Sequence, residues 1–291
     1  MQSKRIKVVF KNQIIYVGID VHKENWSVTF RSNHLLLRTI SMDPNPEVLA
    51  KYLKANYPGA KYMSVYEAGF CGYWIHRALI NYGIDNIIIN SASIPTTGQE
   101  KTRKTDQIDS AKLARELEDN KLHPIYVPTE YYETLRSLTR LRKQYVSDRV
   151  RQKNRIKSFL DFKGKKIPSN YEISNWSGNF ISYLRKLSFT NIEDKIILDS
   201  MLDTLDQIKK RIAKVVVLIR KYINSVPERK QTLTFLTSVP GIGFLTGATL
   251  MAELVDISRF KHLNHLASYV GLVPSVYCSG ETKRNLGITN I

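Results

Sequence analysis

The stretch IIYVGIDVHKENWSVTFRS, residues 14–32, decides the fold of the N-terminal part of this 291-residue chain. It contains two short runs rich in β-branched and aromatic residues, IIYVGID and WSVTFRS, which are typical of neighbouring β-strands. A third run, LLLRTI at residues 35–40, follows, and the pattern then predicts a helix over residues 46–57. The first run ends in an acid, Asp20, which is therefore expected at the end of a strand.

Short apolar runs and amphipathic segments continue to alternate as far as Pro128. We predict strands for YMSVYEA, NIIIN and PIYVP, at residues 62–68, 86–90 and 124–128. Helices are predicted near residues 73–82 and 106–119. Three strands followed by alternating helices and strands indicate a mixed α/β sheet.

The composition favours a nucleic-acid partner. Lysine and arginine number 44 against 26 acids, a formal charge of +18, which attracts phosphate polymers. A basic protein without a specific nucleic-acid role is the alternative. The two cysteines, Cys71 and Cys278, lie far apart, which argues against a disulfide framework and a structural zinc site. Because no apolar run approaches about 18 residues and the N-terminus lacks a signal-peptide pattern, we expect a cytoplasmic protein.

A basic helix is predicted over residues 134–160. Asp148 is the one acid in this segment, against nine basic side chains. Such a charge excess indicates phosphate contacts, although a solvated helix face is the alternative. The basic residues are Arg136, Arg140, Arg142, Lys143, Arg149, Arg151, Lys153, Arg155 and Lys157.

The segment from Leu198 to Tyr222 is predicted to form a coiled coil. Its apolar residues recur at alternating steps of three and four, the pattern of a helical seam. The partner is either the basic helix in antiparallel orientation or a second copy of the chain. A polar loop over residues 164–179 is expected to join the two long helices. The seam consists of Leu198, Met201, Leu205, Ile208, Ile212, Val215, Ile219 and Tyr222.

The C-terminal part begins with LTSVPGIGFLTGATLMAEL, residues 236–254. Gly241 and Gly243 lie in a tight turn before a helix, where they would let a phosphate approach the backbone amides. This arrangement resembles the helix-hairpin-helix elements that bind DNA, and a purely structural hairpin is the alternative. The spacing does not fit a dinucleotide-binding fingerprint.

Four acids form the candidate metal site. Asp20 and Glu67 end two predicted strands, and Asp106 and Asp109 lie three residues apart at the start of a later helix, on one face of it. Clustered carboxylates repel one another unless a cation neutralises them, and hard oxygen ligands suit Mg²⁺ or Mn²⁺. Taken singly, each acid has a structural explanation as a turn, cap or surface residue. Together they predict a site that holds metal against a phosphate.

Four segments resemble the DEDD transposases of insertion sequences, the group that includes the Piv-type pilin-gene invertase. They are YVGIDVHKENWSVTF, YEAGFCGYWIHRAL, KTRKTDQIDSAKLAREL, and TSVPGIGFLTGATLMAEL followed by FKHLNHLASYVGLVPSVYCSGETKR. The resemblance implies a RuvC-like catalytic domain of ribonuclease-H fold at residues 12–130. It further implies a coiled-coil helical spacer at 131–228 and a mainly α-helical transposase domain at 229–291. The acidic tetrad then consists of Asp20, Glu67, Asp106 and Asp109.

The resemblance also assigns a nucleophile. Ser279, in PSVYCSGETKR, matches the serine of the family, and Ser275 is the alternative. A serine hydroxyl needs a base or a metal to become nucleophilic, which a metal-bound tetrad would supply. Lys283 and Arg284 beside the serine are expected to contact scissile phosphates. Arg103 and Lys104, just before the acid pair, are also expected to bind nucleic acid.

Members of this family are guided by a structured noncoding RNA and act as oligomers, so a guide RNA and a homo-dimer or tetramer are expected. The chain ends at NLGITNI, before a basic segment with which the family's C-terminal domain usually continues. We therefore expect a truncated C-terminal domain, which would weaken the positioning of Ser279.

The predicted function is a metal-dependent DNA transposase or recombinase that uses a serine nucleophile in transesterification. A RuvC-like, structure-specific nuclease is one alternative, in which metal-activated water attacks the phosphate. A catalytically inactive nucleic-acid-binding protein is the other.

Overall fold

The computed structural model describes residues 10–94, 105–168, 176–279 and 282–288. The chain divides into two compact units, Met1–Val127 and Pro128–Ile291. Finer domain boundaries within the second unit stay a prediction.

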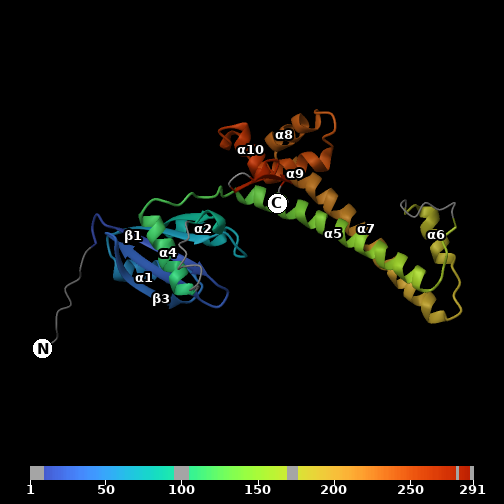
Figure 1. Cartoon of the computed structure of the whole chain (residues 1–291), viewed down its shortest axis with the longest axis horizontal. Coiled ribbons are helices and arrows are strands. Elements are labelled where there is room, and N and C mark those ends of the chain that lie inside the picture. The colour runs from blue at the N-terminus through green and yellow to red at the C-terminus, as the bar shows by residue number, and fades with distance from the viewer. Residues whose placement is uncertain (1–9, 95–104, 169–175, 280–281, 289–291) are drawn as a thin grey trace. The chain divides into compact units, whose positions relative to one another are not determined.

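The first unit is built on a five-stranded mixed sheet with the strand order β3-β2-β1-β4-β5. The strands β1, β2 and β3 are antiparallel neighbours, whereas β1, β4 and β5 run parallel. Figure 1 shows this sheet in blue and cyan. The strands are β1 (Ile14–Val21), β2 (Trp26–Ser32), β3 (Leu35–Met42), β4 (Lys61–Glu67) and β5 (Asp85–Ile89).

Helices cover both faces of the sheet. The helices α1 (Pro46–Asn56) and α2 (Trp74–Asn81) bury one face of β1 through residues such as Ile15 and Val17. The helix α4 (Asp106–Glu118) covers the other face, where its Leu113 packs against Val65. A short 3-10 helix spans Ser91–Ser93. This mixed sheet between helical layers fits the ribonuclease-H-like domain that the sequence predicts.

One predicted strand is wrong. In the segment PIYVP, residues 124–128, only Pro124 forms an isolated bridge, to Ile89. Prolines stand at both ends of this segment, and proline has no N–H group to donate to a sheet. A single backbone hydrogen bond, from Ile125 N–H to the carbonyl of Ile88 at 2.8 Å, continues the contact.

Helix α4 lies unusually close to β1 because residue 18 is a glycine. A Cβ atom at Gly18 would come within 2.1 Å of the Ser110 carbonyl oxygen and 2.4 Å of the Ala114 nitrogen, so no larger residue fits. Around this contact, buried hydroxyls join the helix to the next strand. The Ser110 hydroxyl lies 3.1 Å from that of Ser27 and 2.9 Å from that of Thr29. These contacts fix the position of α4 across the sheet.

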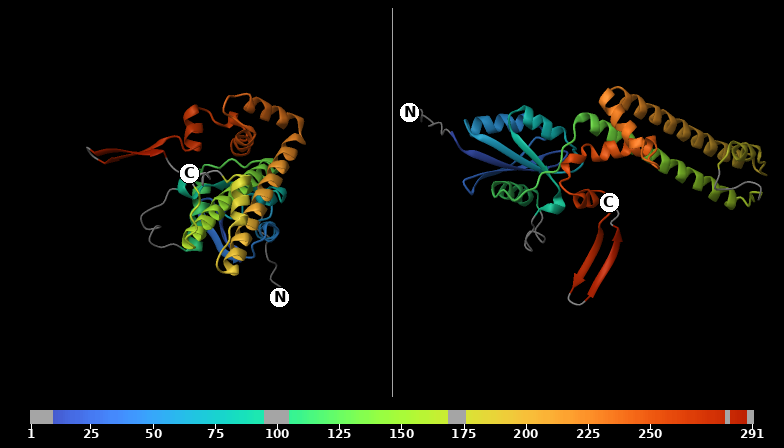
Figure 2. Two further views of the ribbon diagram at one scale, coloured as in Figure 1. Left: turned by 90° about the vertical axis from the view of Figure 1, so that its right-hand side faces the viewer. Right: turned by 90° about the horizontal axis from the view of Figure 1, so that it is seen from above.

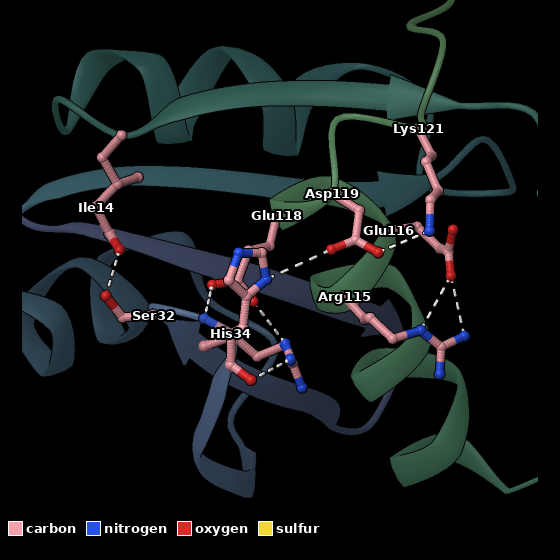
Figure 3. Close-up of polar contacts among 9 residues, drawn as sticks. Ile14, Ser32, His34, Arg115, Glu116, Glu118, Asp119 and Lys121 are labelled. Atoms are coloured by element: carbon pink, nitrogen blue, oxygen red, sulfur yellow. Dashed lines mark hydrogen bonds and ion pairs between the residues drawn. The ribbon is translucent and has the colours of Figure 1, made fainter.

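The C-terminal end of α4 is held by a second contact, drawn in Figure 3. The Glu118 carboxylate accepts a hydrogen bond from Arg31 Nε at 2.9 Å and another from the backbone N–H of His34 at 2.6 Å. Only 3% of the Glu118 side chain is exposed. Asn33 and His34 form the β2–β3 turn with positive φ angles of 51° and 62°, so Glu118 ties the helix to this turn.

The second unit is mainly helical. The long helices α5 (Glu130–Phe162) and α7 (Ile192–Asn224) run antiparallel along each other, as Figures 1 and 2 show. Leu135 near the start of α5 packs with Ile219 near the end of α7, and Leu160 packs with Leu198. The apolar seam therefore pairs with the basic helix within the chain. A coiled-coil supercoil and a contact with a second copy stay predictions.

The remaining elements of this unit include two strands that the sequence analysis did not predict. Residues 178–186, part of which were expected in a loop, begin with the Ser177 hydroxyl capping a helix at the Phe180 N–H. The strands β6 and β7 form an antiparallel hairpin, shown in red in Figure 2. The elements are α6 (Gly178–Lys186), α8 (Pro227–Thr237), α9 (Phe244–Leu254), a 3-10 helix (Ile257–Arg259), α10 (Leu263–Tyr269), β6 (Pro274–Ser279) and β7 (Thr282–Ile288).

Among the described residues, no helix is both long enough and apolar enough to span a membrane.

We predict that Gly18→Ala lowers the free energy of unfolding of the first unit by at least about 2 kcal/mol, because the added methyl group overlaps the backbone of α4. Urea unfolding followed by the fluorescence of buried Trp26 measures the change. The control is Gly69→Ala, where the added Cβ would meet its nearest atom at 3.9 Å. Equal stability of the two variants would contradict the close contact.

We also predict that Glu118→Ala destabilises the first unit by roughly 2–4 kcal/mol, because it leaves Arg31 Nε and the His34 N–H without their acceptor. Thermal unfolding by circular dichroism measures this loss. The neighbouring Asp119→Ala serves as the control, since Asp119 pairs at the surface with Lys121 and, at 3.7 Å, with the exposed His34 ring, and the loss of such pairs should change little. A Glu118→Ala protein as stable as the control would show that this contact does not hold α4.

Candidate active site

Three side chains converge at the C-terminal end of β1. Asp20 is the last residue but one of β1, His22 follows the strand, and Asp106 is the first residue of α4. His22 Nε2 lies 3.0 Å from Asp20 Oδ2 and 3.6 Å from Asp106 Oδ1. One ligand atom from each of the three residues lies within 4.8 Å of the other two. This spacing allows all three to bind one metal ion.

Local structure explains why Asp106 lies there. The Thr105 hydroxyl caps α4 by accepting a hydrogen bond from the Ile108 N–H at 3.3 Å, so the helix begins at Asp106 rather than with Asp106 as its cap. Acids in the first turn are favourable because the N-terminus of a helix carries a partial positive charge. The close contact at Gly18 then brings this first turn to the end of β1.

The electrostatics of the cluster favour a bound cation. Burial raises the pKa of the Asp20 carboxyl above its usual value. The charge and hydrogen bond of His22 act in the opposite direction, while the negative charges of Asp106 and Asp109 raise this pKa further. Asp109 is thus near enough to Asp20 to repel it. A divalent cation would remove the repulsion among these carboxylates.

Glu67 lies at the same edge of the sheet but outside the compact group. The parallel strands β1 and β4 pair Ile19 with Tyr66, so Asp20 and Glu67 each follow that pair by one residue. Because side chains alternate along a strand, Glu67 shares its face with Val65, which packs against α4. Among the described residues, neither Glu67 nor Asp109 belongs to the three-ligand group.

His22 is the member that sequence reasoning missed. The predicted tetrad contained only acids, and no cluster of histidines pointed to this one. The available signal was its position two residues after Asp20, because residues i and i+2 share a face in an extended chain. Arg103 and Lys104, which were predicted to bind nucleic acid beside this site, lie outside the described residues.

The predicted nucleophile lies in the β6–β7 hairpin. Backbone pairing sets Ser279 opposite Thr282, Cys278 opposite Lys283, and Tyr277 opposite Arg284. The hairpin therefore places the backbone of both basic residues directly across from the end of the strand that contains Ser279. The alternative nucleophile, Ser275, lies near the start of β6, where the pairing register shifts.

Some basic residues of α5 form ion pairs or hydrogen bonds with other parts of the protein. Arg140 forms two hydrogen bonds of 3.0 Å with the Glu253 carboxylate. Arg136 binds the carbonyls of Ala252 and Glu253 at the end of α9. Arg151 lies 3.4 Å from Asp148. Arg136 and Arg140 therefore join helices, and phosphate contacts by the other bases of α5 stay a prediction.

Several of those other bases form one positive cluster. Burial lowers the pKa of Lys153, and the positive charges of Arg149, Lys209 and Lys157 lower it further. Lys209 comes from α7, so the cluster extends across both long helices. The Nε atoms of Arg149 and of Arg142 are buried without a hydrogen-bond partner. Lys143 and Arg155 are exposed on the same helix.

The predicted phosphate-binding glycines lie between α8 and α9. Gly241 has a φ of +89°, a conformation that favours glycine, and Gly243 is the residue before the first turn of α9. A Cβ atom at either position would meet nothing within 4 Å, so both are open to a partner. At Gly247, in contrast, a Cβ would lie 2.9 Å from Leu233 of α8, so this glycine serves helix packing. A helix-hairpin-helix function of this turn stays a prediction.

Comparison with known protein families identifies both parts of the chain. Residues 17–164 match the transposase family model DEDD_Tnp_IS110, and residues 233–291 match the model described as "Transposase IS116/IS110/IS902 family". The first match alone spans half of the chain and includes the cluster around Asp20.

Individual relatives agree with these matches. The chain is 27% identical to y4rJ, a candidate transposase of Sinorhizobium fredii, over 94% of this chain and 76% of that protein. It is 26% identical to the IS1533 transposase of Leptospira borgpetersenii over 85% and 73% of the two chains. It is 40% identical to the pilin gene-inverting protein of Moraxella bovis, over 21% of this chain and 19% of that protein.

The coverage of some relatives is smaller. The chain spans about half the length, 53%, of y4qE, another candidate transposase of Sinorhizobium fredii, to which it is 27% identical over 77% of its own residues. The matches favour a transposase over the structure-specific nuclease and the inactive binding protein that the sequence left as alternatives. With a ribonuclease-H-like sheet, clustered carboxylates and family matches in both units, this chain belongs to the IS110 family of DNA transposases.

Proposed function

We propose that the protein is a metal-dependent DNA transposase that breaks and rejoins the ends of an insertion sequence. The observation that carries this proposal is the convergence of Asp20, His22 and Asp106 within 4.8 Å, at the end of β1 of a ribonuclease-H-like sheet. Asp106 and Asp109 add negative charge beside the half-buried Asp20, and a divalent cation would offset the repulsion among these carboxylates.

The donor set fits a divalent metal ion. Asp20 and Asp106 offer hard carboxylate oxygens, which suit Mg²⁺ and Mn²⁺, and the imidazole of His22 is a common ligand of transition metals such as Mn²⁺. Asp109 and Glu67 would complete the tetrad from the same face of the sheet. When bound, the ion would polarise a phosphoryl group and stabilise negative charge on the attacking and leaving oxygens.

The reaction would be a transesterification at phosphorus. The Ser279 hydroxyl oxygen forms a new bond to phosphorus while the bond from phosphorus to the leaving sugar oxygen breaks. The serine proton is lost to a base, and the leaving oxygen takes up a proton. The phosphoserine ester retains the energy of the broken bond, so a second sugar hydroxyl can displace the serine and rejoin the strand. Lys283 and Arg284 would bind the non-bridging phosphate oxygens.

The remaining predicted contacts would hold the nucleic acid along the chain. Arg149 and Lys153 belong to the positive cluster of α5 and α7, whose mutual repulsion a bound phosphate would offset. Arg142, Lys143 and Arg155 would add to this surface. Gly241 and Gly243 would present open backbone before α9, and Arg103 and Lys104 would bind strand phosphates near the acids.

We further propose the partners that the resemblance implies. They are the DNA of the element, a structured noncoding guide RNA, and further copies of the chain in a dimer or tetramer. In bacteria such as the hosts of its relatives, the protein would act in the cytoplasm, where their DNA lies.

The metal site predicts a measurable affinity. We expect Mn²⁺ binding, measured by calorimetry, to weaken at least about tenfold in Asp20→Asn and in Asp106→Asn, because each loses a charged ligand. Asp43→Asn, an exposed acid of the first unit, is the matched control and should bind like the unaltered protein. His22→Ala tests the third ligand. Unchanged affinity in Asp20→Asn would refute the site.

The serine step predicts a covalent intermediate. We expect the full chain, incubated with the ends of its element, the adjacent noncoding transcript and Mg²⁺, to form a protein–DNA adduct that survives denaturing electrophoresis. The adduct should disappear in Ser279→Ala and in Asp20→Asn and persist in Ser275→Ala.

The reverse dependence on the two serines would identify Ser275 as the nucleophile. Cleavage without any adduct, undiminished in both serine variants, would instead support attack by water and contradict transesterification.

A further inference from the structure

Two large aromatic side chains are exposed after Glu67, Phe70 in the segment between β4 and α2 and Trp74 at the first position of α2. Phe70 is 65% exposed and Trp74 is 52% exposed. Aromatic residues of this size normally bury most of their surface, and exposed apolar patches on a folded protein mark binding sites. Phe70 lies three residues and Trp74 seven residues after Glu67, a predicted metal ligand at the end of β4.

The segment that presents these rings is firmly held. The buried Tyr66 hydroxyl donates a hydrogen bond to the Gly72 carbonyl at 3.1 Å and accepts one from the His76 N–H at 3.2 Å. Cys71, between the two aromatics, is buried in the core of the sheet. Phe70 is therefore exposed from an ordered turn, and Trp74 is exposed from the first turn of α2.

The turn lies beside the cluster of Asp20, His22 and Asp106. The Lys23 ammonium, on the residue after His22, lies 5.9 Å from the centre of the Phe70 ring. The connection that follows β1 and the segment that follows β4 therefore meet at the same edge of the sheet. The Phe70 ring and the Lys23 cation therefore lie near the strand end that contains Asp20, and Trp74 follows on the first turn of α2.

We propose that Phe70 and Trp74 form a stacking platform for unpaired bases of the DNA strand whose phosphate is bound at the carboxylates. This inference rests on the proposed function. An aromatic ring offers a base a stacking partner that does not depend on its sequence, and Lys23 complements the adjacent phosphate. Bases inside a duplex already stack on each other, so the platform requires a strand that is opened next to the reacting phosphate.

The first test uses tryptophan fluorescence without any cleavage step. In a Trp176→Phe background the remaining tryptophans are Trp26, which is 1% exposed, and Trp74. We expect a single-stranded oligodeoxynucleotide, with Ca²⁺ in place of Mg²⁺, to quench the Trp74 emission, and a blunt duplex of the same sequence to quench it far less. Equal quenching by both, or none by either, would overturn the platform.

The second test compares affinities. We expect Phe70→Ala/Trp74→Ala to bind the single strand roughly ten- to a hundredfold more weakly, as for the loss of one or two stacked bases. The duplex affinity should change much less. Phe70→Tyr/Trp74→Phe keeps both rings and should restore binding. Leu36→Ala, which removes an exposed apolar side chain from β3, is the control and should bind like the unaltered protein.

Two outcomes would overturn this inference. One is single-strand affinity that is unchanged in the double alanine variant. The other is a change in the sedimentation of the double variant without a change in DNA binding, which would make the surface a contact between proteins. Both readouts are independent of strand transfer, so stacking without adduct formation would refute only the proposed chemistry.

Discussion

The close contact of α4 with β1 at Gly18 is the constraint on which the candidate site depends. Because residue 18 has no side chain, the backbone of α4 lies directly over the strand, where even a methyl group would overlap Ser110 and Ala114. Asp20 lies two residues further along the same face of β1, and Asp106 lies one helical turn before Ser110. The contact therefore brings the two carboxylates together. The ion pair of Glu118 with Arg31 fixes the other end of the helix, so α4 cannot pivot about the glycine.

Asp106 and Asp109, the acids at the start of α4, affect both the stability of their own helix and the electrostatics at the end of β1. Asp106 and Asp109 stabilise the N-terminus of their own helix through its partial positive charge, and this needs no partner elsewhere. The same negative charges raise the pKa of Asp20, which is an energetic cost once α4 lies against β1. A divalent cation bound by these carboxylates would remove this repulsion and so stabilise the folded structure. The electrostatics thus support a metal site independently of the family match.

The basic residues of the second unit also have divided roles. Arg136 and Arg140 bind Glu253 and the carbonyls at the end of α9, which attaches the C-terminal helices to α5. Lys153 and Arg149, in contrast, lie in a cluster of like charges that extends onto α7. A count of bases along the helix could not separate these groups, because it contains no information about which acids approach from distant parts of the chain.

The sequence by itself determined the local elements and the chemical class of the site. Hydrophobic periodicity placed the five strands, the helices between them and the two long helices, and the acids at Asp20, Glu67, Asp106 and Asp109 indicated metal chemistry. It failed at PIYVP, where the two prolines have no N–H group to donate to a sheet, and at β6 and β7, whose residues mix polar, apolar and basic types. Only the tertiary structure decided that His22 joins Asp20 and Asp106, that α7 packs on α5, and that Phe70 and Trp74 remain exposed. Periodicity reports which face of an element is buried, whereas these contacts depend on the distance between elements, which is set by backbone packing such as that at Gly18.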